Sequence, residues 1–482
     1  MNLAIVALLF MGMVLIGVLS FRRIKGTDSF FVADRRGTPF LISGSLVATI
    51  VGGSSTIGMA GKGFSWGLVG AWWMLVGVVG LFLLFVFLAR RIRDYGLFTL
   101  PELLEKQYGA SVKFVASLVI VWSWIGIIGG QIVASGRILN TMMPGNLSFM
   151  MGLSAAIFIA YTILGGQISI IRTDAVQSVI MIAGILLCAY LSLQRIGGIT
   201  AMNSHLPRDF FLFPVNSHFS WKNLVEWLVL IGSTYMVGPD IYSRLFSSRD
   251  GETARKSVLV TALILIPLAF SIVLIGMSAR VLAPSLSGEE AFPYMIREVL
   301  PWGINSFVLA ALLCAVMSSA DTVLLTSSII FSMDIVNDLV KSVRGRELDE
   351  RKILLLSRLA VILFGLVALG FALKSRGVIN LLLFGYSIYT AGLVVPVILG
   401  FYRHKLGLNL IGAMTAVIGG GGWVIFGKTA PVGRFGLERL VSLSPGFQGV
   451  LLSLILLFVG SYAFPPRVQG REARSPAEGD KR

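Results

Sequence analysis

The chain has 482 residues, of which 56% are hydrophobic and only 13% are charged. Soluble domains carry about 25% charged residues, so the composition excludes an ordinary soluble protein and favours a chain embedded in lipid, where charged groups are costly. The formal net charge is +16, but the basic residues lie between apolar runs and not on one face of a domain. We interpret them as topology determinants that face anionic lipid, and we expect no nucleic-acid partner.

The apolar runs predict about thirteen transmembrane helices, because a spanning helix needs roughly 20 mostly apolar residues. In chain order, the expected spans are 2–20, 40–60, 66–89, 112–142, 147–165, 174–194, 222–243, 257–280, 303–333, 353–373, 378–401, 408–427 and 446–464. An N-terminus outside puts the basic segments 90–113, 244–256 and 341–352 inside, as the positive-inside rule requires. An odd number of spans then puts the C-terminus inside.

The two ends of the chain are expected to differ. No Lys or Arg precedes the apolar run in 1–20, and Arg22, Arg23 and Lys25 follow it. A signal peptide begins with a basic region, so residues 1–20 are predicted to be a retained extra helix. The tail 465–482 is polar and lacks apolar periodicity, so we expect a disordered cytoplasmic segment there.

Catalytic and metal chemistry have no support in the sequence. Cys188 and Cys314 are isolated within apolar runs, so neither a disulfide nor a metal framework follows from them. No apolar run combines a nucleophile with a base or gathers a set of metal ligands. These features argue against an enzyme, including one whose site lies within the membrane.

The second span contains a polar interruption, Ala48-Thr-Ile-Val-Gly-Gly-Ser-Ser-Thr56. Gly52 and Gly53 each lower helix propensity by about 1 kcal/mol relative to Ala. A helix broken here would release carbonyl groups that can bind a cation. The alternative is close helix packing through small residues.

The seventh span contains a second interruption, Gly232-Ser-Thr-Tyr-Met-Val-Gly-Pro-Asp240. Pro239 has no amide hydrogen and disrupts the bond to the residue four before it. Two interrupted helices, five spans apart, are typical of a transporter built from inverted repeats with a site near the membrane midplane. An ordinary proline kink is the alternative here.

The ninth span carries polar residues on one helical face. Ala315, Ser318, Ser319 and Thr322 recur at helical spacing, and hydroxyl and carbonyl oxygens are the ligands that hard cations such as sodium prefer. The hydroxyls could instead bond back to their own helix. Asp321 adds a negative charge within the membrane, and this favours the cation interpretation.

Four separated motifs carry a family resemblance. The most specific is Tyr161–Gln177 (YTILGGQISIIRTDAVQ), with a Tyr-Thr-x-x-Gly-Gly and a Thr-Asp-x-x-Gln pattern. The others are Gly-x-Ala-Gly-x-Gly at Gly58–Gly63, Pro-Asp-x-x-x-Arg at Pro239–Arg244, and Ser-Ser followed by Met-Asp-Ile within 318–335. Together they resemble the sodium:solute symporter family, which includes sodium-coupled proline, pantothenate, sialic acid and glucose carriers.

The resemblance implies an all-α integral membrane fold of two inverted five-helix repeats, as in the amino-acid transporter LeuT. The first repeat is expected at 40–194 and the second at 222–401. The extra helix in 1–20 would precede them, and two additional helices in 408–464 would follow.

The resemblance also implies a sodium site between the first and eighth helices of this core. Carried over by motif, its ligands are the carbonyl oxygens of Ala48, Val51 and Ala315 and the hydroxyl oxygens of Ser318 and Ser319.

Some members of the family have a second cation site, and its positions match Asp174, Asp321 and Thr322. Members usually have a hydroxyl residue where this chain has Asp321. That departure leaves three roles open for Asp321: a ligand of a second cation, a proton acceptor, or the partner of Arg172 in an ion pair.

The solute is not identified by the resemblance. Proline carriers have an acidic residue where this chain has Ile50, and glucose carriers have Asn there and His where this chain has Ser55, so neither solute is supported. Arg137 could meet a carboxylate or, near a helix end, reach the interface. The candidates for the solute pocket are Gly52, Gly53, Ser54, Ser55, Gln131 and Tyr235.

The expected function is sodium-coupled import of a small organic solute by alternating access, in a bacterial inner membrane. The partners would be the solute, the sodium ion and the lipid bilayer, with no obligatory protein partner. Proton coupling through Asp174 or Asp321 is one alternative. A solute sensor with a transporter fold is another; such proteins usually carry a signalling domain, and the short tail after Pro466 argues against one.

Overall fold

The computed structural model describes residues 11–12, 26–143, 145–375, 378–429 and 443–465, and these form helices with only two isolated β-bridges. Ten of the described helical segments are long and apolar enough to cross a membrane. Pro39–Ile50 and Leu147–Ile163 are shorter apolar helices. Each predicted span from 40–60 onward falls on helix. The total number of spans, and the side of the membrane on which each terminus lies, stay predictions.

Two predictions fall on residues that are mostly or wholly undescribed. The structure describes only Met11 and Gly12 of the extra helix expected in 1–20, and the expected tail lies outside the described residues from 466 onward.

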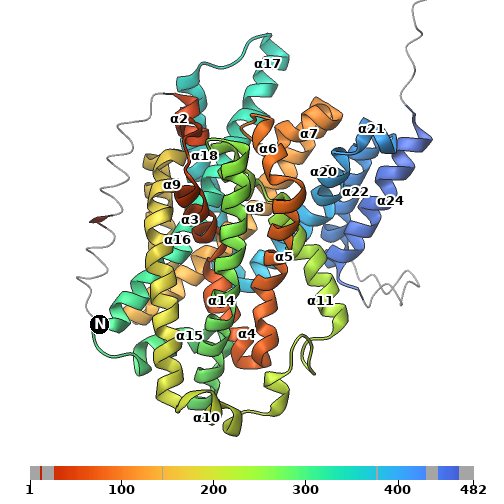
Figure 1. Cartoon of the computed structure of the whole chain (residues 1–482). Coiled ribbons are helices and arrows are strands. Elements are labelled where there is room, and N and C mark those ends of the chain that lie inside the picture. Colours follow the sequence, from red (N-terminus) through yellow and green to blue (C-terminus); the bar gives the residue numbers. More distant parts are fainter. Residues whose placement is uncertain (1–10, 13–25, 144, 376–377, 430–442, 466–482) are drawn as a thin grey trace, which may run out of the picture.

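The first half of the chain contributes five main helices to the bundle shown in Figure 1. They are α3 (Pro39–Ile50) with α4 (Met59–Trp66), α5 (Trp72–Phe87), α8 (Ala110–Met142) and the two parts of α9 (Leu147–Ile196). Gly166 divides α9, because its φ of 56° and ψ of −179° are not helical. A Cβ at Gly166 would lie 2.6 Å from the ring of Phe30, so this position needs a glycine both for its backbone angle and for the close approach of α2 (Thr27–Val32).

The second half repeats the order of a broken helix followed by long ones. Its members are α11 (Trp221–Trp227), α12 (Ser233–Val237) and α13 (Pro239–Ser247), then α14 (Gly251–Leu282), α16 (Ile304–Ile330), α18 (Glu350–Ser375) and α19 (Val378–Tyr389) with α20 (Val395–Gly400). Two further helices, α22 (Leu410–Thr429) and α24 (Pro445–Ala463), pack against each other at one side of the bundle (Figure 1).

Helix α16 lies at the centre of the bundle. The apolar 18-residue stretch of its span is 100% buried inside the protein, whereas the corresponding stretches of α18 and α22 are only 39% buried. Helices α3, α8, α9 and α18 surround α16. The outer helices expose large apolar side chains such as Leu359, Leu363 and Leu366, as a surface in contact with lipid does. The polar face predicted on α16 is therefore enclosed by protein.

Both predicted helix interruptions are confirmed. Helix α3 ends at Ile50, and Val51 has φ −83° and ψ 75°, outside the helical region. Helix α12 ends at Val237, and Gly238 is extended, with φ −66° and ψ 134°. A proline disfavours the helical conformation in the residue before it, and Pro239 then starts α13 at a position where its missing amide hydrogen costs nothing.

Candidate functional site

The first interruption redirects backbone hydrogen bonds. In a regular helix the Gly52 amide would donate to the Ala48 carbonyl, four residues earlier. Here it donates to the Ile50 carbonyl at 3.0 Å instead. The Ala48 carbonyl is thus released from its own helix.

A side chain from another helix causes the next redirection. The Gly53 amide donates to Gln131 Oε1 at 2.8 Å, and the Thr49 carbonyl loses its helical partner as a result. A Cβ at Gly53 would lie 2.2 Å from the Cβ of Ala134. Gly53 therefore allows α8 to approach closely enough for Gln131 to hold the chain open.

The released carbonyls meet the two serines of α16. Ser318 Oγ lies 2.8 Å from the Ala48 carbonyl oxygen, and Ser319 Oγ lies 2.8 Å from that of Thr49. Both hydroxyls are also within 3.2 Å of the Ala315 carbonyl oxygen. These two stretches of chain, more than 260 residues apart in the sequence, thus form one cluster of oxygens.

Each serine hydroxyl carries a single hydrogen, so it can donate to only one of these carbonyls at a time. Ser318 and Ser319 are within hydrogen-bond distance of carbonyls of their own helix and of carbonyls of α3. Both alternatives predicted from the sequence are therefore possible for these hydroxyls. Among the described contacts, neither serine donates to the carbonyl of Val51. The carbonyl that joins this oxygen cluster is that of Thr49, which the sequence analysis did not include.

A buried ion pair lies beside Thr322, which is one helical turn after Ser318 on α16. Arg244 is fully buried, and its guanidinium contacts Asp174 Oδ2 at 3.1 Å. It also donates to Ser45 at 3.1 Å and to the hydroxyl of Thr322. Asp174 and Thr322, two of the three residues proposed for a second cation, thus both contact the guanidinium of Arg244. This partner was not predicted from the sequence.

Asp321 has a different environment. Its side chain is fully buried, and its Oδ1 accepts a hydrogen bond from Thr162 at 3.2 Å. In the described part of the chain Asp321 forms no ion pair in direct contact, although Asp174 and Arg244 both act on it electrostatically.

A cavity of about 30 Å³ lies between the two interruptions. Three of the predicted pocket residues line it: Ser54, Gln131 and Tyr235. Gly52 and Gly53 lie at the adjacent interruption and contact Gln131. The Ser55 hydroxyl donates to the Ile50 carbonyl at 2.9 Å and also interacts with the hydroxyl of the lining residue Tyr235.

The sequence analysis missed several residues that line this cavity. Trp124 comes from α8 and Tyr386 from α19, and each is an aromatic residue in an apolar run, without any local signal. Asp240 also lines the cavity. It directly follows Pro239, so its place at the second interruption was a signal that could have identified it.

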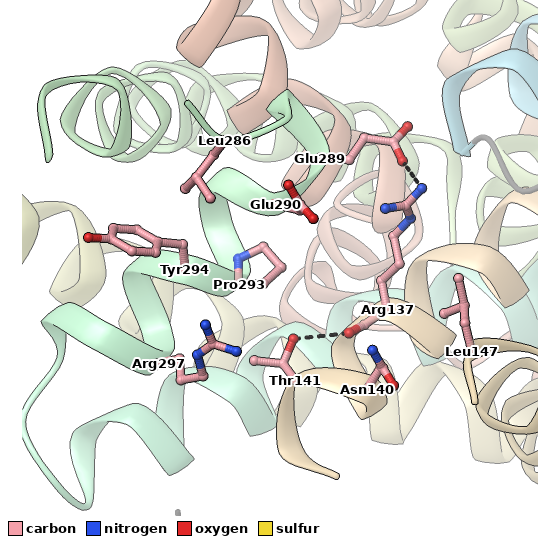
Figure 2. A pocket seen from close by; sticks show the side chains of 10 residues that line it. All are labelled: Arg137, Asn140, Thr141, Leu147, Leu286, Glu289, Glu290, Pro293, Tyr294 and Arg297. Carbon is pink, nitrogen blue, oxygen red and sulfur yellow. Dashed lines mark hydrogen bonds and ion pairs between the residues drawn. The ribbon is translucent and has the colours of Figure 1, made fainter. Parts of the chain in front are cut away.

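A salt bridge lies at the predicted outer end of the bundle. Arg137 Nη2 on α8 contacts Glu289 Oε2 at 2.6 Å (Figure 2). Hollows of about 310 Å³ and 400 Å³ share both of these residues in their walls. The neighbouring Glu290 accepts hydrogen bonds from the hydroxyl and amide of Ser287, which lower its pKa and keep it ionised. The charge of Arg137 is thus neutralised by the carboxylate of Glu289.

Comparisons with known proteins agree with this architecture. Residues 30–420 match a family profile described as "Sodium:solute symporter family". The chain is 25% identical to the "High-affinity proline transporter PutP" of Bacillus subtilis (strain 168), over 93% of this chain and 95% of the relative. It is 24% identical to the "Sodium/glucose cotransporter" of Vibrio parahaemolyticus, over 82% of this chain and 78% of the relative.

A solved structure of "a Na+-coupled sialic acid symporter" in a substrate-bound outward-open state matches with a TM-score of 0.83 and 19% identity. The match covers 96% of this chain and 98% of that chain. This likeness confirms the predicted fold class.

Proposed function

The chain belongs to the sodium:solute symporter family and is a sodium-coupled symporter of small solutes, and from this premise we propose that its sodium ion binds where the interruption after α3 meets α16. The ligands would be the carbonyl oxygens of Ala48, Thr49 and Ala315 and the hydroxyl oxygens of Ser318 and Ser319. Val51 remains a further candidate from the family resemblance. The membrane is proposed to be a bacterial inner membrane.

The observation that supports this site is the pairing of released carbonyls with hydroxyls. A hydroxyl that now donates to the Ala48 or Thr49 carbonyl can turn its hydrogen away and offer a lone pair. A cation between the two helices would then replace hydrogen bonds with ion–oxygen contacts. Because the oxygens come from both α3 and α16, binding would favour the conformation that brings these helices together.

One sodium ion is favoured over two. Arg244 contacts Asp174 and Thr322, so a second cation there would meet an existing positive charge. An inside-negative potential contributes about 2.3 kcal/mol per charge per 100 mV moved inward. A single ion therefore suffices for useful accumulation of the solute.

The central cavity is proposed as the solute site. A volume of about 30 Å³ holds one or two water molecules and no organic solute, so the cavity must enlarge when the solute enters. We expect the interrupted helices of the two repeats, 40–194 and 222–401, to move against the rest of the bundle in alternating access. The Arg137–Glu289 pair lies where an outer gate would close.

Proton coupling is the second candidate. Asp321 is buried and accepts one hydrogen bond from Thr162, and a buried carboxylate without a cation in contact can take up a proton. Under this alternative, a fall in pH would stabilise the protein in place of sodium, and Asp321→Asn would abolish that response.

The sodium site is tested by thermal unfolding of the purified protein in sodium chloride and in potassium chloride. We expect selective stabilisation by sodium, about 2.7 kcal/mol at a hundred times Kd, and its loss in the Ser318→Ala/Ser319→Ala variant. The matched control is Ser327→Ala/Ser328→Ala, because those hydroxyls of the same helix donate only to their own helix, at 2.6 and 2.8 Å. A full sodium response in the Ser318→Ala/Ser319→Ala variant would remove the assignment.

A further inference from the structure

Asp240 is a charged side chain in the wall of the central cavity. It stands in the first turn of α13, directly after the second interruption, and it lines the cavity together with residues of α3, α8 and α19. An acidic residue in the first turn stabilises a helix through the positive end of its dipole. In that local role the carboxylate accepts hydrogen bonds from the backbone amides of Asp240 and Ile241, and the same residue also forms part of the cavity wall.

Asp240 has no ion-pair partner in the described part of the chain. The nearest cation on its own helix is Arg244, one turn later, and that guanidinium contacts Asp174 at 3.1 Å and Ser45 at 3.1 Å. Arg244 acts on Asp240 only from a distance, and a carboxylate removed from water without an opposite charge in contact costs free energy. The cavity therefore presents a negative charge that an incoming group could neutralise.

Three aromatic side chains surround the same cavity. Trp124, Tyr235 and Tyr386 line it from three different helices. The ring of Trp124 packs edge-on against Tyr389 at 4.7 Å between centroids, and the ring of Tyr235 lies against Gly77, where a Cβ would be 2.7 Å away. Rings fixed in this way can attract a cation over their faces, which is worth about 0.5–2 kcal/mol each.

The charges of the side chains that line the cavity also favour a positively charged group on the solute. The cavity lining includes no Lys, Arg or His. The one carboxylate among the lining residues that the structure describes is that of Asp240. A purely anionic solute would meet no cationic partner here other than sodium, and a neutral solute would leave Asp240 unpaired.

We propose that the transported solute carries a protonated amine or a quaternary ammonium group, which binds between the Asp240 carboxylate and the rings of Trp124, Tyr235 and Tyr386. This inference rests on the proposed function, because it takes the central cavity as the transport site. Asp240 would act as the residue that selects the solute class. Sodium, by contrast, would bind at the neighbouring oxygen cluster and would not need this carboxylate.

The probes for the test are matched pairs that differ in one positive charge. Choline is compared with 3,3-dimethyl-1-butanol, its uncharged carbon isostere, and L-alanine is compared with L-lactate. Each is added to the purified full chain in sodium chloride, and the apparent affinity is taken from the concentration dependence of the unfolding temperature. We expect stabilisation by a member that carries the amine or ammonium group and none by its partner.

The variant for the test is Asp240→Asn, which keeps the size of the side chain. We expect it to lower the apparent affinity for the cationic probe at least tenfold while stabilisation by sodium alone persists. Asp250→Asn is the matched control, since Asp250 also begins a helix but is exposed and away from the cavity.

Three outcomes would overturn the proposal: equal stabilisation by both members of a pair, an amine or ammonium probe whose affinity is unchanged in Asp240→Asn, or no stabilisation by either choline or L-alanine. Failure of the proposed sodium site would be distinguished by Ser318→Ala/Ser319→Ala. Retained sodium stabilisation in that variant would remove the sodium assignment, whatever the probes do.

Discussion

The two interrupted helices at the centre of the molecule differ in what covers their free backbone groups. At the first, the carbonyls of Ala48 and Thr49 face serine hydroxyls that can turn away. At the second, the carbonyl of Val237 accepts a hydrogen bond from the hydroxyl of Tyr389, a fully buried residue. The carbonyl of Leu230, earlier in the same broken helix, is also used, by the hydroxyl of Thr390 at 2.8 Å.

This difference indicates that a break in a membrane helix does not by itself make a cation site. The released carbonyls must also face other small oxygen ligands. Where a tyrosine hydroxyl already occupies a carbonyl, as at Val237, that oxygen is not available to a cation, and the contribution of the break is the side chain that it presents. At the second break that side chain is Asp240, in the first turn of the helix that follows.

Arg244 connects the two interruptions. It belongs to α13, which follows the second break, and it donates to Ser45 on α3, which precedes the first break. The same guanidinium contacts Asp174 on α9 and Thr322 on α16. We expect this link to hold the two broken helices in register, so that the function of the first depends on the integrity of the second.

The largest expected effect comes from breaking that link. Asp174→Asn leaves the Arg244 guanidinium buried without its counter-ion, which we expect to destabilise the protein by about 3–5 kcal/mol. Replacing both partners by apolar residues, as in Asp174→Leu/Arg244→Met, should recover part of the loss, because no uncompensated charge then remains buried. Thermal unfolding of the purified variants measures both changes.

The control for this cycle is an exposed ion pair. Arg90 and Asp94 are 3.8 Å apart, with side chains 72% and 59% exposed, and Asp94→Asn should cost about 0–1 kcal/mol. If Asp174→Asn costs no more than Asp94→Asn, the buried pair of Asp174 and Arg244 does not stabilise the fold.

A smaller effect is expected from closing the space at the first break. The Cβ of a Gly53→Ala variant would lie 2.2 Å from the Cβ of Ala134, and overpacking of this kind costs about 1–3 kcal/mol. Since the clash pushes α8 away from the break, stabilisation by sodium should fall along with overall stability. Unfolding temperatures in sodium and in potassium chloride measure both.

Gly370→Ala serves as the comparison for that variant. A Cβ at Gly370, on α18, would meet nothing within 4 Å, and alanine favours a helix by about 1 kcal/mol over glycine. We expect equal or higher stability and an unchanged sodium response. An unchanged sodium response in Gly53→Ala would mean that the cluster of oxygens does not need the close approach of α8.

The sequence predicts the breaks and the serine face because both depend on local features. Gly52, Gly53 and Pro239 weaken a helix wherever it packs, and the spacing of Ser318 and Ser319 directs both hydroxyls to one side. These elements were predictable without a partner helix.

The remaining parts of the site depend on contacts between distant segments. Thr49 joins the oxygens because Gln131, from another helix, takes the Gly53 amide. The pair of Asp174 and Arg244 joins residues 70 positions apart, and no local pattern indicates that their helices touch. Such contacts are set by tertiary packing, so the sequence supplied the candidates without their partners.

The smallest expected effect tests the second break directly. Tyr389→Phe removes the hydroxyl that donates to the Val237 carbonyl, a hydrogen bond with a net contribution of about 0.5–1.5 kcal/mol. Because this carbonyl belongs to a structural break, the sodium response should stay at the wild-type level while the unfolding temperature falls. A changed sodium response in Tyr389→Phe would mean that the second break also contributes oxygens to a cation, and the contrast between the two interruptions would then be lost.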